Sequence, residues 1–441
     1  MSLRTHACGQ LRVSDAGKEV VLSGWVDSFR VAGKISFLTV RDRTGTTQVF
    51  LNAALTDHCK HLQKESVVQV FGKVNKRPEK QINPAMHTGE VEVEAQRVEI
   101  LSLAEAPLPI EIREETTTSL DKRLDYRFLD FRRERVKAIF MIRSKIYTAF
   151  VHALEKHGFI QVALPKITES GVESGAEEFK IPYFGKTASL AQSPQIYKQM
   201  FVVSGLERVF EIGPVFRAEK SHTTRHLTEF TGIDFEMGFI ESEEEVMRMA
   251  ENVIHDVWAE VKEKAKEELQ ILGKEITVPT IPFPRVSLHE LRKVLAAKGK
   301  IIPEDDDPDA AAEIMIGEYI KEKYHHDFVF ALDYPFTKRP FYHMRPADDP
   351  SVTKSFDLIY RGVEIGTGAQ REHRVDVLRQ QCELKGLDLD KLPAYRDIFR
   401  YGAPPHGGIG LGMDRIVNLM LELGNVREGI PLPRDPDRLT P

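Results

Sequence analysis

Hydrophobic and polar positions alternate in short runs between Lys18 and Glu99, and turn residues separate these runs. A period of two is typical of strands with one buried face. The runs read VVLSGWVDSF, ISFLTVRDRTGTTQVFL, SVVQVFGKV and GEVEVEAQRVEIL, with a helical stretch, LTDHCKHLQK, before the third of them. The pattern predicts a five-stranded β-barrel of the OB type, whose surface binds single-stranded nucleic acid. A barrel that only packs against the next domain is the alternative.

A helical pattern follows a proline-punctuated segment, Ala104 to Ile112. Apolar side chains recur with a period near 3.6 at Val136, Ile139, Phe140, Ile142, Ile146, Phe150 and Leu154. Gly158 predicts the end of this helix.

The remainder alternates strand-like runs with helices, which predicts an α+β domain built on an antiparallel sheet flanked by helices. We therefore expect three parts: an OB-fold barrel over residues 1–103, a linker or hinge over 104–128, and a larger domain over 129–441.

Composition excludes some classes of protein. No run approaches the ~20 apolar residues of a membrane span, and the first residues lack the apolar centre of a signal peptide. We expect a cytoplasmic protein without a membrane partner. Its cysteines, Cys8, Cys59 and Cys382, form no C-x-x-C pair, so we expect reduced thiols. The net charge of −6 neither favours nor excludes binding to RNA.

The first candidate site is Phe216-Arg217-Ala218-Glu219, followed by a polar loop and a second strand that contains Phe230. An arginine at a strand end can hold a phosphate through two hydrogen bonds, and Phe230 offers a face for a base. A surface ion pair between Arg217 and Glu219 is the alternative.

The second candidate is the glycine-rich run from Gly407 to Arg415, which leads into a helix. Glycines before a helix let the backbone approach a phosphate or a planar base, and Arg415 could stack on adenine. A dinucleotide-binding fingerprint is excluded because these glycines lie at the end of the chain. A glycine turn without ligand remains the alternative.

The third candidate is the segment from Phe356 to Arg374. A turn at Arg361-Gly362 would make it a hairpin and bring Asp357 and Glu364 to one site. Carboxylate oxygens beside phosphates suit Mg²⁺. Exposed hairpin acids are the alternative.

Together these segments resemble the class II aminoacyl-tRNA synthetases over nearly the whole chain. GFIQVALPKI, with Pro165 near its end, is similar to motif 1 of that class, FRAE to motif 2, and GIGLGMDR to motif 3. The resemblance implies ATP as substrate, Mg²⁺ as cofactor, tRNA as partner and a homodimer.

Within the class, Gln192 to Gln199 and Gly368 to Arg374 resemble the aspartate enzymes of archaeal and eukaryotic type. The resemblance implies activation of L-aspartate to aspartyl-adenylate and transfer to tRNA(Asp), with tRNA(Asn) open as a second substrate. Asparaginyl- and lysyl-tRNA synthetases are the enzymatic alternatives. A non-catalytic paralogue is disfavoured because Arg217, Glu219, Glu364 and Arg415 are all present.

The resemblance also implies a role for individual residues. The catalytic residues that the resemblance implies are Arg217, Glu219 and Arg415. Its ATP-binding residues are Arg217, Ala218, Glu219, Arg225, His226, Leu227, Phe230, Glu364, Gly412, Met413, Asp414 and Arg415. Its aspartate-binding residues are Glu173, Gln195, Lys198, Arg217, Asp234, Thr367 and Arg371. Its metal site comprises Asp357, Glu364 and Thr367, and its anticodon-binding residues are Arg30, Phe37 and Gln48.

The barrel departs from the archaeal pattern in two places. The segment Arg77 to Gly89 resembles the bacterial form, and Asp27 stands where archaeal relatives tend to carry an aromatic ring or histidine. We expect relaxed tRNA choice, because Pro84 has no N–H and a carboxylate repels phosphate. Lys76, Arg77 and Lys80 are the cations that could restore discrimination between tRNA(Asp) and tRNA(Asn).

Overall fold

The computed structural model describes residues 3–113, 117–169, 178–220, 225 and 227–441. The chain divides into two units, Met1–Pro109 and Ile110–Pro441. Each unit has its own hydrophobic core. The finer division expected from the sequence, with a separate linker, stays a prediction.

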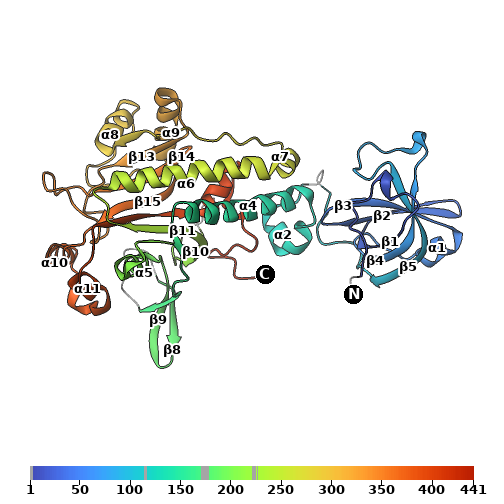
Figure 1. Cartoon of the computed structure of the whole chain (residues 1–441), viewed down its shortest axis with the longest axis horizontal. Helices are drawn as coiled ribbons and strands as arrows, with labels where there is room; N and C mark the ends of the chain where they lie inside the picture. Colours follow the sequence, from blue (N-terminus) through green and yellow to red (C-terminus); the bar gives the residue numbers. More distant parts are fainter. Residues whose placement is uncertain (1–2, 114–116, 170–177, 221–224, 226) are drawn as a thin grey trace. The chain divides into compact units, whose positions relative to one another are not determined.

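The first unit is a closed barrel with the strand order β1-β2-β3-β5-β4 (Figure 1). Its elements are β1 (Glu19–Ala32), β2 (Ile35–Asp42), β3 (Gly45–Leu51), α1 (Ala53–His58), β4 (Val67–Lys76) and β5 (Val91–Ser102). Valine and leucine side chains alternate inward along every strand and fill the barrel. Gly24 and Gly72 permit close strand packing, because a Cβ there would lie 2.3 Å and 2.4 Å from a backbone oxygen. The predicted barrel, with a helix between its third and fourth strands, is confirmed.

The second unit is built on an eight-stranded sheet of order β12-β13-β14-β15-β16-β11-β10-β6. Its strands are β6 (Ile160–Gln161), β10 (Arg208–Phe216), β11 (Glu229–Gly238), β12 (Arg285–Ser287), β13 (Phe328–Leu332), β14 (Ser355–Tyr360), β15 (Val363–Arg371) and β16 (His406–Gly412). All pairs are antiparallel except β6 with β10 and β12 with β13, which are parallel. The predicted α+β architecture is confirmed, with parallel pairs only near the two edges.

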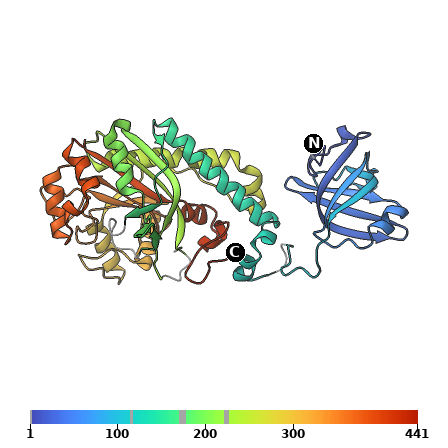
Figure 2. The ribbon, with the colours of Figure 1, turned by 90° about the horizontal axis from the view of Figure 1, so that it is seen from below.

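Helices α4 (Glu134–Lys156) and α6 (Glu243–Lys264) run beside each other along one face of this sheet (Figures 1 and 2). Five of the apolar positions predicted for the first of them are buried in the main core, Val136 is also buried, and Phe140 is half-buried. The helix ends just before Gly158, whose φ of 81° favours glycine. The prediction for α4 is confirmed.

The second unit contains further helices. They are α2 (Leu120–Asp125), α3 (Arg127–Asp130), α5 (Gln195–Phe201), α7 (Lys266–Leu272), α8 (Leu288–Ala297), α9 (Ala310–Tyr324), α10 (Val375–Leu384), α11 (Pro393–Arg400) and α12 (Met413–Met420). A small sheet of order β7-β9-β8 comprises β7 (Ile167–Glu169), β8 (Lys180–Tyr183) and β9 (Lys186–Leu190). In the part of the chain that the structure describes, no helix is both long and apolar enough to cross a membrane. All three cysteines are buried free thiols.

The hairpin predicted at Arg361-Gly362 joins β14 to β15. Both turn residues have positive φ, 50° and 73°, as a two-residue hairpin of this kind requires. A Cβ on Gly362 would lie 2.8 Å from the Cα of Ile314, so α9 packs directly against the turn. This contact brings the first turn of α9 to the start of β15.

Candidate active site

A cavity of about 430 Å³ lies on the face of the sheet away from α4 and α6. Alternation along β11 shows the division: Ile233 and Phe235 belong to the core beneath α4 and α6, whereas Asp234 lines the cavity. Side chains from β10, β11, β15, β16 and α5 contribute to the wall. The three sequence segments expected to form one site therefore meet.

The glycine-rich run forms a central strand, β16, which leads into α12 as expected. β16 lies between β15 and β11, with Gly408 opposite Glu236 and Gly410 opposite Asp234. A Cβ at Gly408 would lie 2.2 Å from the Glu236 carboxylate, and one at Gly410 would lie 2.8 Å from Asp234. These glycines therefore leave room for two acidic side chains on the neighbouring strand.

Two cations lie at the floor of the cavity, and both contact acidic side chains of β11. Lys198 Nζ donates to Asp234 at 3.0 Å and lies 3.4 Å from Glu236. Arg371 donates to both Glu236 oxygens, at 2.9 and 3.2 Å, and to the carbonyl of Gly408 at 3.0 Å. Both cations are 2% exposed. The two cations expected to face a substrate are thus also held by two carboxylates.

Electrostatics favour the ionised form of Glu236. Burial alone would raise the pKa of Glu236, but Arg371 and Lys198 outweigh burial and lower it. Burial, and then the charge of Arg371, hold the pKa of His343 well below its ordinary value. His343 Nε2 lies 3.0 Å from Arg371 Nη1 and accepts its proton as a neutral ring.

Two donors at this floor are buried and have no partner among the described residues. They are Gln195 Nε2 and, once Nε2 of His343 accepts, His343 Nδ1. Both residues line the cavity, as does Arg371. Unpaired buried donors are costly, so this end of the cavity suits a ligand that accepts hydrogen bonds.

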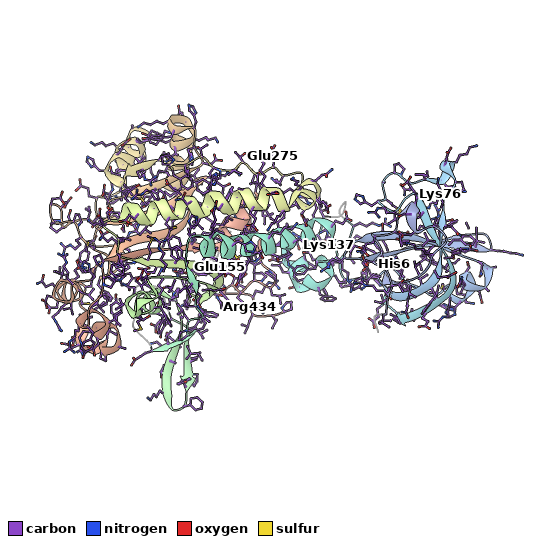
Figure 3. The ribbon with its side chains drawn as sticks, viewed as in Figure 1. His6, Lys76, Lys137, Glu155, Glu275 and Arg434 are labelled. Carbon is purple, nitrogen blue, oxygen red and sulfur yellow. The ribbon has the colours of Figure 1, made fainter. Side chains whose placement is uncertain are left out.

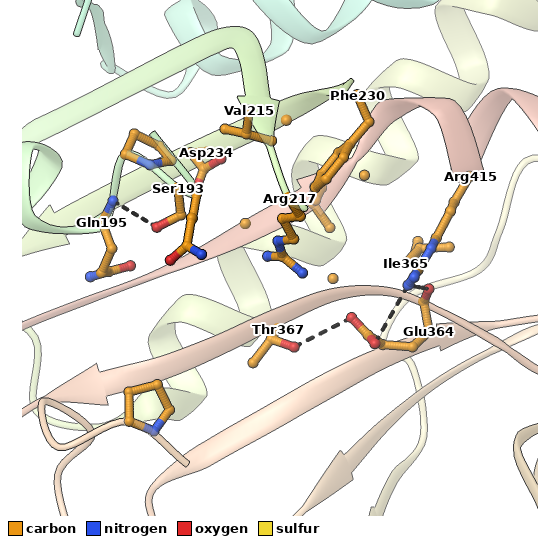
Figure 4. A pocket seen from close by; sticks show the side chains of 18 of the residues that line it. Ser193, Gln195, Val215, Arg217, Phe230, Asp234, Glu364, Ile365, Thr367 and Arg415 are labelled. Carbon is orange, nitrogen blue, oxygen red and sulfur yellow. Dashed lines mark hydrogen bonds and ion pairs between the residues drawn. The ribbon is translucent and has the colours of Figure 1, made fainter. Parts of the chain in front are cut away.

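The other end of the cavity combines an aromatic ring with arginines (Figure 4). Phe230 on β11 and Arg415 on α12 point into the same space, and the Arg217 guanidinium lies 5.3 Å from the Phe230 ring. Arg415 is fixed by Glu364, whose carbonyl accepts from Nη1 at 2.8 Å. Glu219 also lines this end, next to Arg217. The arrangement can hold a planar base between Phe230 and Arg415, with phosphate near Arg217.

Some residues expected to bind nucleotide are engaged within the protein, although Leu227, Gly412 and Asp414 also line the cavity. Met413 is 1% exposed and belongs to the main core. Leu227 is buried in a small apolar cluster with Val426 and Ile430, against which Phe230 packs. Both Asp414 oxygens are engaged, by Arg143 at 2.5 Å and by the backbone N–H of Thr231 at 2.8 Å. Gly412 and Ala218 contribute only backbone and small surface.

The expected metal residues meet at β14 and β15. Thr367 donates to Asp357 at 2.7 Å and lies 3.4 Å from Glu364. Both Asp357 oxygens also accept from Arg339, at 3.0 and 2.6 Å. Glu364 is the more open carboxylate, with 33% of its side chain exposed. Sequence reasoning missed Arg339, because it lies in an irregular segment before β14.

Glu313 on α9 is a second acid at this end that the sequence did not reveal. Its carboxylate accepts from the backbone N–H of Glu364 at 3.1 Å and lies 3.6 Å from Arg225. Burial, and then the negative charge of Glu364, raise the pKa of Glu313 to about 7. Arg225 itself lines the cavity.

Two expected site residues, Glu173 and His226, lie outside the described residues. Of the unexpected ones, Glu236 had a detectable signal, because it follows Asp234 by two positions on a strand and therefore shares its face. His343 and Glu313 come from segments with no motif, so no local pattern could have identified them.

The barrel brings its three expected residues onto one surface. Arg30 on β1 lies opposite Phe37 on β2, which lies opposite Phe50 on β3. The Arg30 guanidinium is 5.5 Å from the Phe37 ring, and the two phenylalanine rings are 5.9 Å apart. Gln48 donates to Glu92 at 2.9 Å. This surface offers an aromatic platform beside an amide and a carboxylate, the chemistry that binds unpaired bases.

Asp27 and Arg77 are placed differently from what the sequence suggested. Asp27 accepts from Arg41 at 2.6 Å, and Arg41 also binds both oxygens of Glu65 at 2.8 Å. Arg77 is buried, 4% exposed, so it is not a free cation of its loop. Lys76, labelled in Figure 3, and Lys80 remain exposed.

Comparisons with known proteins agree with this geometry. Residues 119–436 match the family model described as tRNA synthetases class II (D, K and N), and residues 20–101 match the OB-fold nucleic acid binding domain. The chain is 43% identical over 444 residues to the aspartate–tRNA(Asp) ligase of Pyrococcus abyssi, and the alignment covers 100% of both chains. It is 43% identical to the aspartate–tRNA(Asp/Asn) ligase of Aeropyrum pernix, covering 96% of each.

A solved structure shows the same fold. Asparaginyl-tRNA synthetase from Pyrococcus horikoshii, complexed with asparaginyl-adenylate, has a TM-score of 0.88 and 31% identity, covering 99% of both chains. The matches span the barrel and the larger unit together. The chain therefore belongs to the class II tRNA synthetases of the D, K and N group.

Proposed function

We propose that the chain is an aspartate–tRNA ligase, which activates L-aspartate with ATP and transfers it to the 3′ end of tRNA(Asp). The observation that carries this proposal is the buried floor formed by Arg371, Glu236 and Lys198, next to a site for a nucleotide. The names of the full-length relatives support the same substrate.

Selection of aspartate follows from the donors at the floor. Of the five guanidinium N–H groups of Arg371, four have acceptors among the described residues, which leaves one for a ligand. Gln195 adds an unpaired amide donor. A carboxylate only accepts hydrogen bonds and satisfies both groups, whereas the amide of asparagine would present its own N–H groups to them.

The α-ammonium group of aspartate needs an acceptor at the same floor. Asp234 lines the cavity and is held by Lys198, so its second oxygen can accept from the ammonium. We assign Glu173 the same role from the family resemblance, and Thr367 stands at the neighbouring edge of the cavity.

Activation needs positioning and charge neutralisation more than proton transfer, because the α-carboxylate is already ionised at neutral pH. Arg217 holds the α-phosphate, and the adenine lies between Phe230 and Arg415 with Glu219 accepting from its edge. From the family resemblance, we assign Arg225 and His226 to the binding of the outer phosphates. The carboxylate attacks the α-phosphate in line and pyrophosphate leaves.

Magnesium fits the residues present. Glu364 offers an open carboxylate and Thr367 a hydroxyl next to it, and Mg²⁺ takes few protein ligands when phosphates and water supply the others. When bound, the ion would neutralise charge on the phosphates. Asp357 accepts hydrogen bonds from Thr367 and Arg339 and so orients both side chains.

The two remaining partners are RNA and a second copy of the chain. The surface of the barrel around Arg30, Phe37 and Gln48 binds the anticodon in this proposal. A homodimer is supported by β6, an edge strand of the sheet with Ile160 47% exposed, and by the exposed Met141 and Tyr147 of α4. The place of action is the cytoplasm.

Arg371→Leu tests the assignment of the floor. We expect loss of aspartate binding in calorimetry, with ATP binding retained, because the substitution removes a donor to the substrate carboxylate only. Arg371→Lys keeps the charge but loses the two-pronged contact, so it should also fail to bind aspartate tightly.

The matched control is Arg374→Leu, which removes an arginine three residues away whose side chain is 55% exposed and pairs with Glu372. This variant should bind aspartate normally. Loss of ATP binding in Arg371→Leu with aspartate binding intact would show that the two halves of the cavity are assigned the wrong way round.

A further inference from the structure

The nucleotide half of the cavity is tied to α4 on the opposite face of the sheet by one arginine. Arg143 Nη1 donates to Asp414 Oδ1 at 2.5 Å and to the carbonyl of Gly429 at 3.1 Å. Arg143 Nη2 donates to the hydroxyl of Thr231 at 3.2 Å. Its side chain is 13% exposed and that of Asp414 is 4% exposed. A single guanidinium thus joins α4, β11, α12 and the segment after α12.

Asp414 also connects α12 directly to β11. Its second oxygen accepts from the backbone N–H of Thr231 at 2.8 Å. The regular pairing of β11 with β16 ends at Gly232 and Gly412, so the Asp414 side chain provides the acceptor that the next strand residue would have provided. The carboxylate is also well placed near the N-terminus of α12.

The two residues bonded by this link are the chain neighbours of the two residues that form the base slot. Thr231 follows Phe230 on β11, and Asp414 precedes Arg415 on α12. Among the described residues, Phe230 and Arg415 make no cation–π contact with each other, and each is carried by its own element. The separation between their side chains therefore depends on how β11 and α12 are joined.

We propose that Arg143 is a positioning residue of the nucleotide site, which through Asp414 sets the separation of Phe230 and Arg415 for adenine. The inference rests on the proposed function only in taking the base to lie between these two side chains. Because Arg143 touches no substrate, its loss should weaken ATP binding and leave the aspartate floor unchanged.

The test is Arg143→Met in the full chain, with ATP and aspartate affinities measured separately by calorimetry. We expect the Kd for ATP to rise at least tenfold and the Kd for aspartate to change less than threefold. Arg143→Lys retains one donor to Asp414 and should give an intermediate ATP affinity. The matched control is Lys145→Met, which removes another cation of α4, one that binds Glu268 on α7 at 2.6 Å.

A second variant separates positioning from stability. Arg143→Met alone leaves Asp414 as a buried carboxylate without its cation, which can weaken the fold. The double variant Arg143→Met with Asp414→Asn removes both charges, so its melting temperature should recover while its ATP affinity stays low.

Three results would overturn the inference: an unchanged ATP affinity in Arg143→Met, an equal loss of affinity for ATP and aspartate, or recovery of ATP affinity together with stability in the double variant. Failure of the proposed function gives a different result. In that case the wild-type chain binds ATP but not aspartate, and the effect of Arg143→Met on ATP still decides the inference.

Discussion

Replacement of Glu313 by glutamine should make the stability of the second unit less dependent on pH. Glu313 on α9 has 18% of its side chain exposed and lies beside the backbone of Glu364. Burial, and then the charge of Glu364, raise its pKa from 4.5 to about 7. Since one pKa unit corresponds to about 1.4 kcal/mol, this shift is worth about 3 kcal/mol.

The sign follows from the direction of the shift. A carboxyl whose pKa is raised by folding stabilises the folded chain fully below pH 4.5, where the group is protonated in both states. That stability is lost as the pH rises through about 7, because the folded chain must then hold a buried charge. Glutamine stays neutral at both pH values. The substitution Glu313→Gln should therefore increase the free energy of unfolding more at pH 8 than at pH 4.5, by up to about 3 kcal/mol.

The assay is urea unfolding of the full chain without nucleotide or magnesium at these two pH values. Wild type and variant both carry Trp25→Phe, so that Trp258, the other of the two tryptophans, reports the second unit alone. Glu318→Gln is the control, because Glu318 is an exposed acid on the same helix. Equal effects of Glu313→Gln at both pH values would refute the reasoning that burial and Glu364 destabilise the ionised carboxylate.

Three further predictions concern the reaction, the assembly and the RNA. Arg217→Ala should abolish adenylate formation in an intact fold, with a loss of ~2.7–4 kcal/mol by analogy with one oxyanion donor, and near-normal pyrophosphate exchange would contradict this. Sedimentation should show a homodimer at nanomolar concentration, and a stable, active monomer would exclude it. Charging kinetics should give efficiencies for tRNA(Asp) and tRNA(Asn) within about tenfold, or roughly 1.4 kcal/mol. A preference of several hundredfold for tRNA(Asp) would show that the loop containing Lys76 and Lys80 does discriminate between the two tRNAs.

The sequence predicted the elements whose periodicity is local. The barrel strands, α4 and the hairpin at Arg361-Gly362 were all found, because alternation, a period near 3.6 and turn residues are properties of neighbouring positions. The helical stretch from Glu243 onward comprises two helices, α6 and α7, with a break at Ala265. Nothing in the polar pattern there marks the break.

The position of the glycine run could not be predicted from local preference. Glycine is disfavoured in strands, so nothing local in Gly407 to Gly412 predicted a strand. Its place in β16 follows from the carboxylates of Asp234 and Glu236, which lie opposite Gly410 and Gly408 and need the space. This is a relation between strands far apart in sequence.

The site likewise contains residues that the sequence predicted and residues that it did not. Arg217, Phe230, Glu364 and Arg415 were expected together because each lies in a motif, and all four line the cavity. Their supports were missed: Arg339 holds Asp357, Glu313 contacts the backbone of Glu364, and Arg143 holds Asp414. Each support comes from a segment without a motif, so only the fold reveals it.

Aspartate-dependent ATP–pyrophosphate exchange, with asparagine and lysine as competing substrates, tests which amino acid the chain activates. We predict exchange with aspartate and little with the other two, because the donors of Arg371 and Gln195 match a carboxylate acceptor. Exchange supported by asparagine or lysine in preference to aspartate would contradict the account.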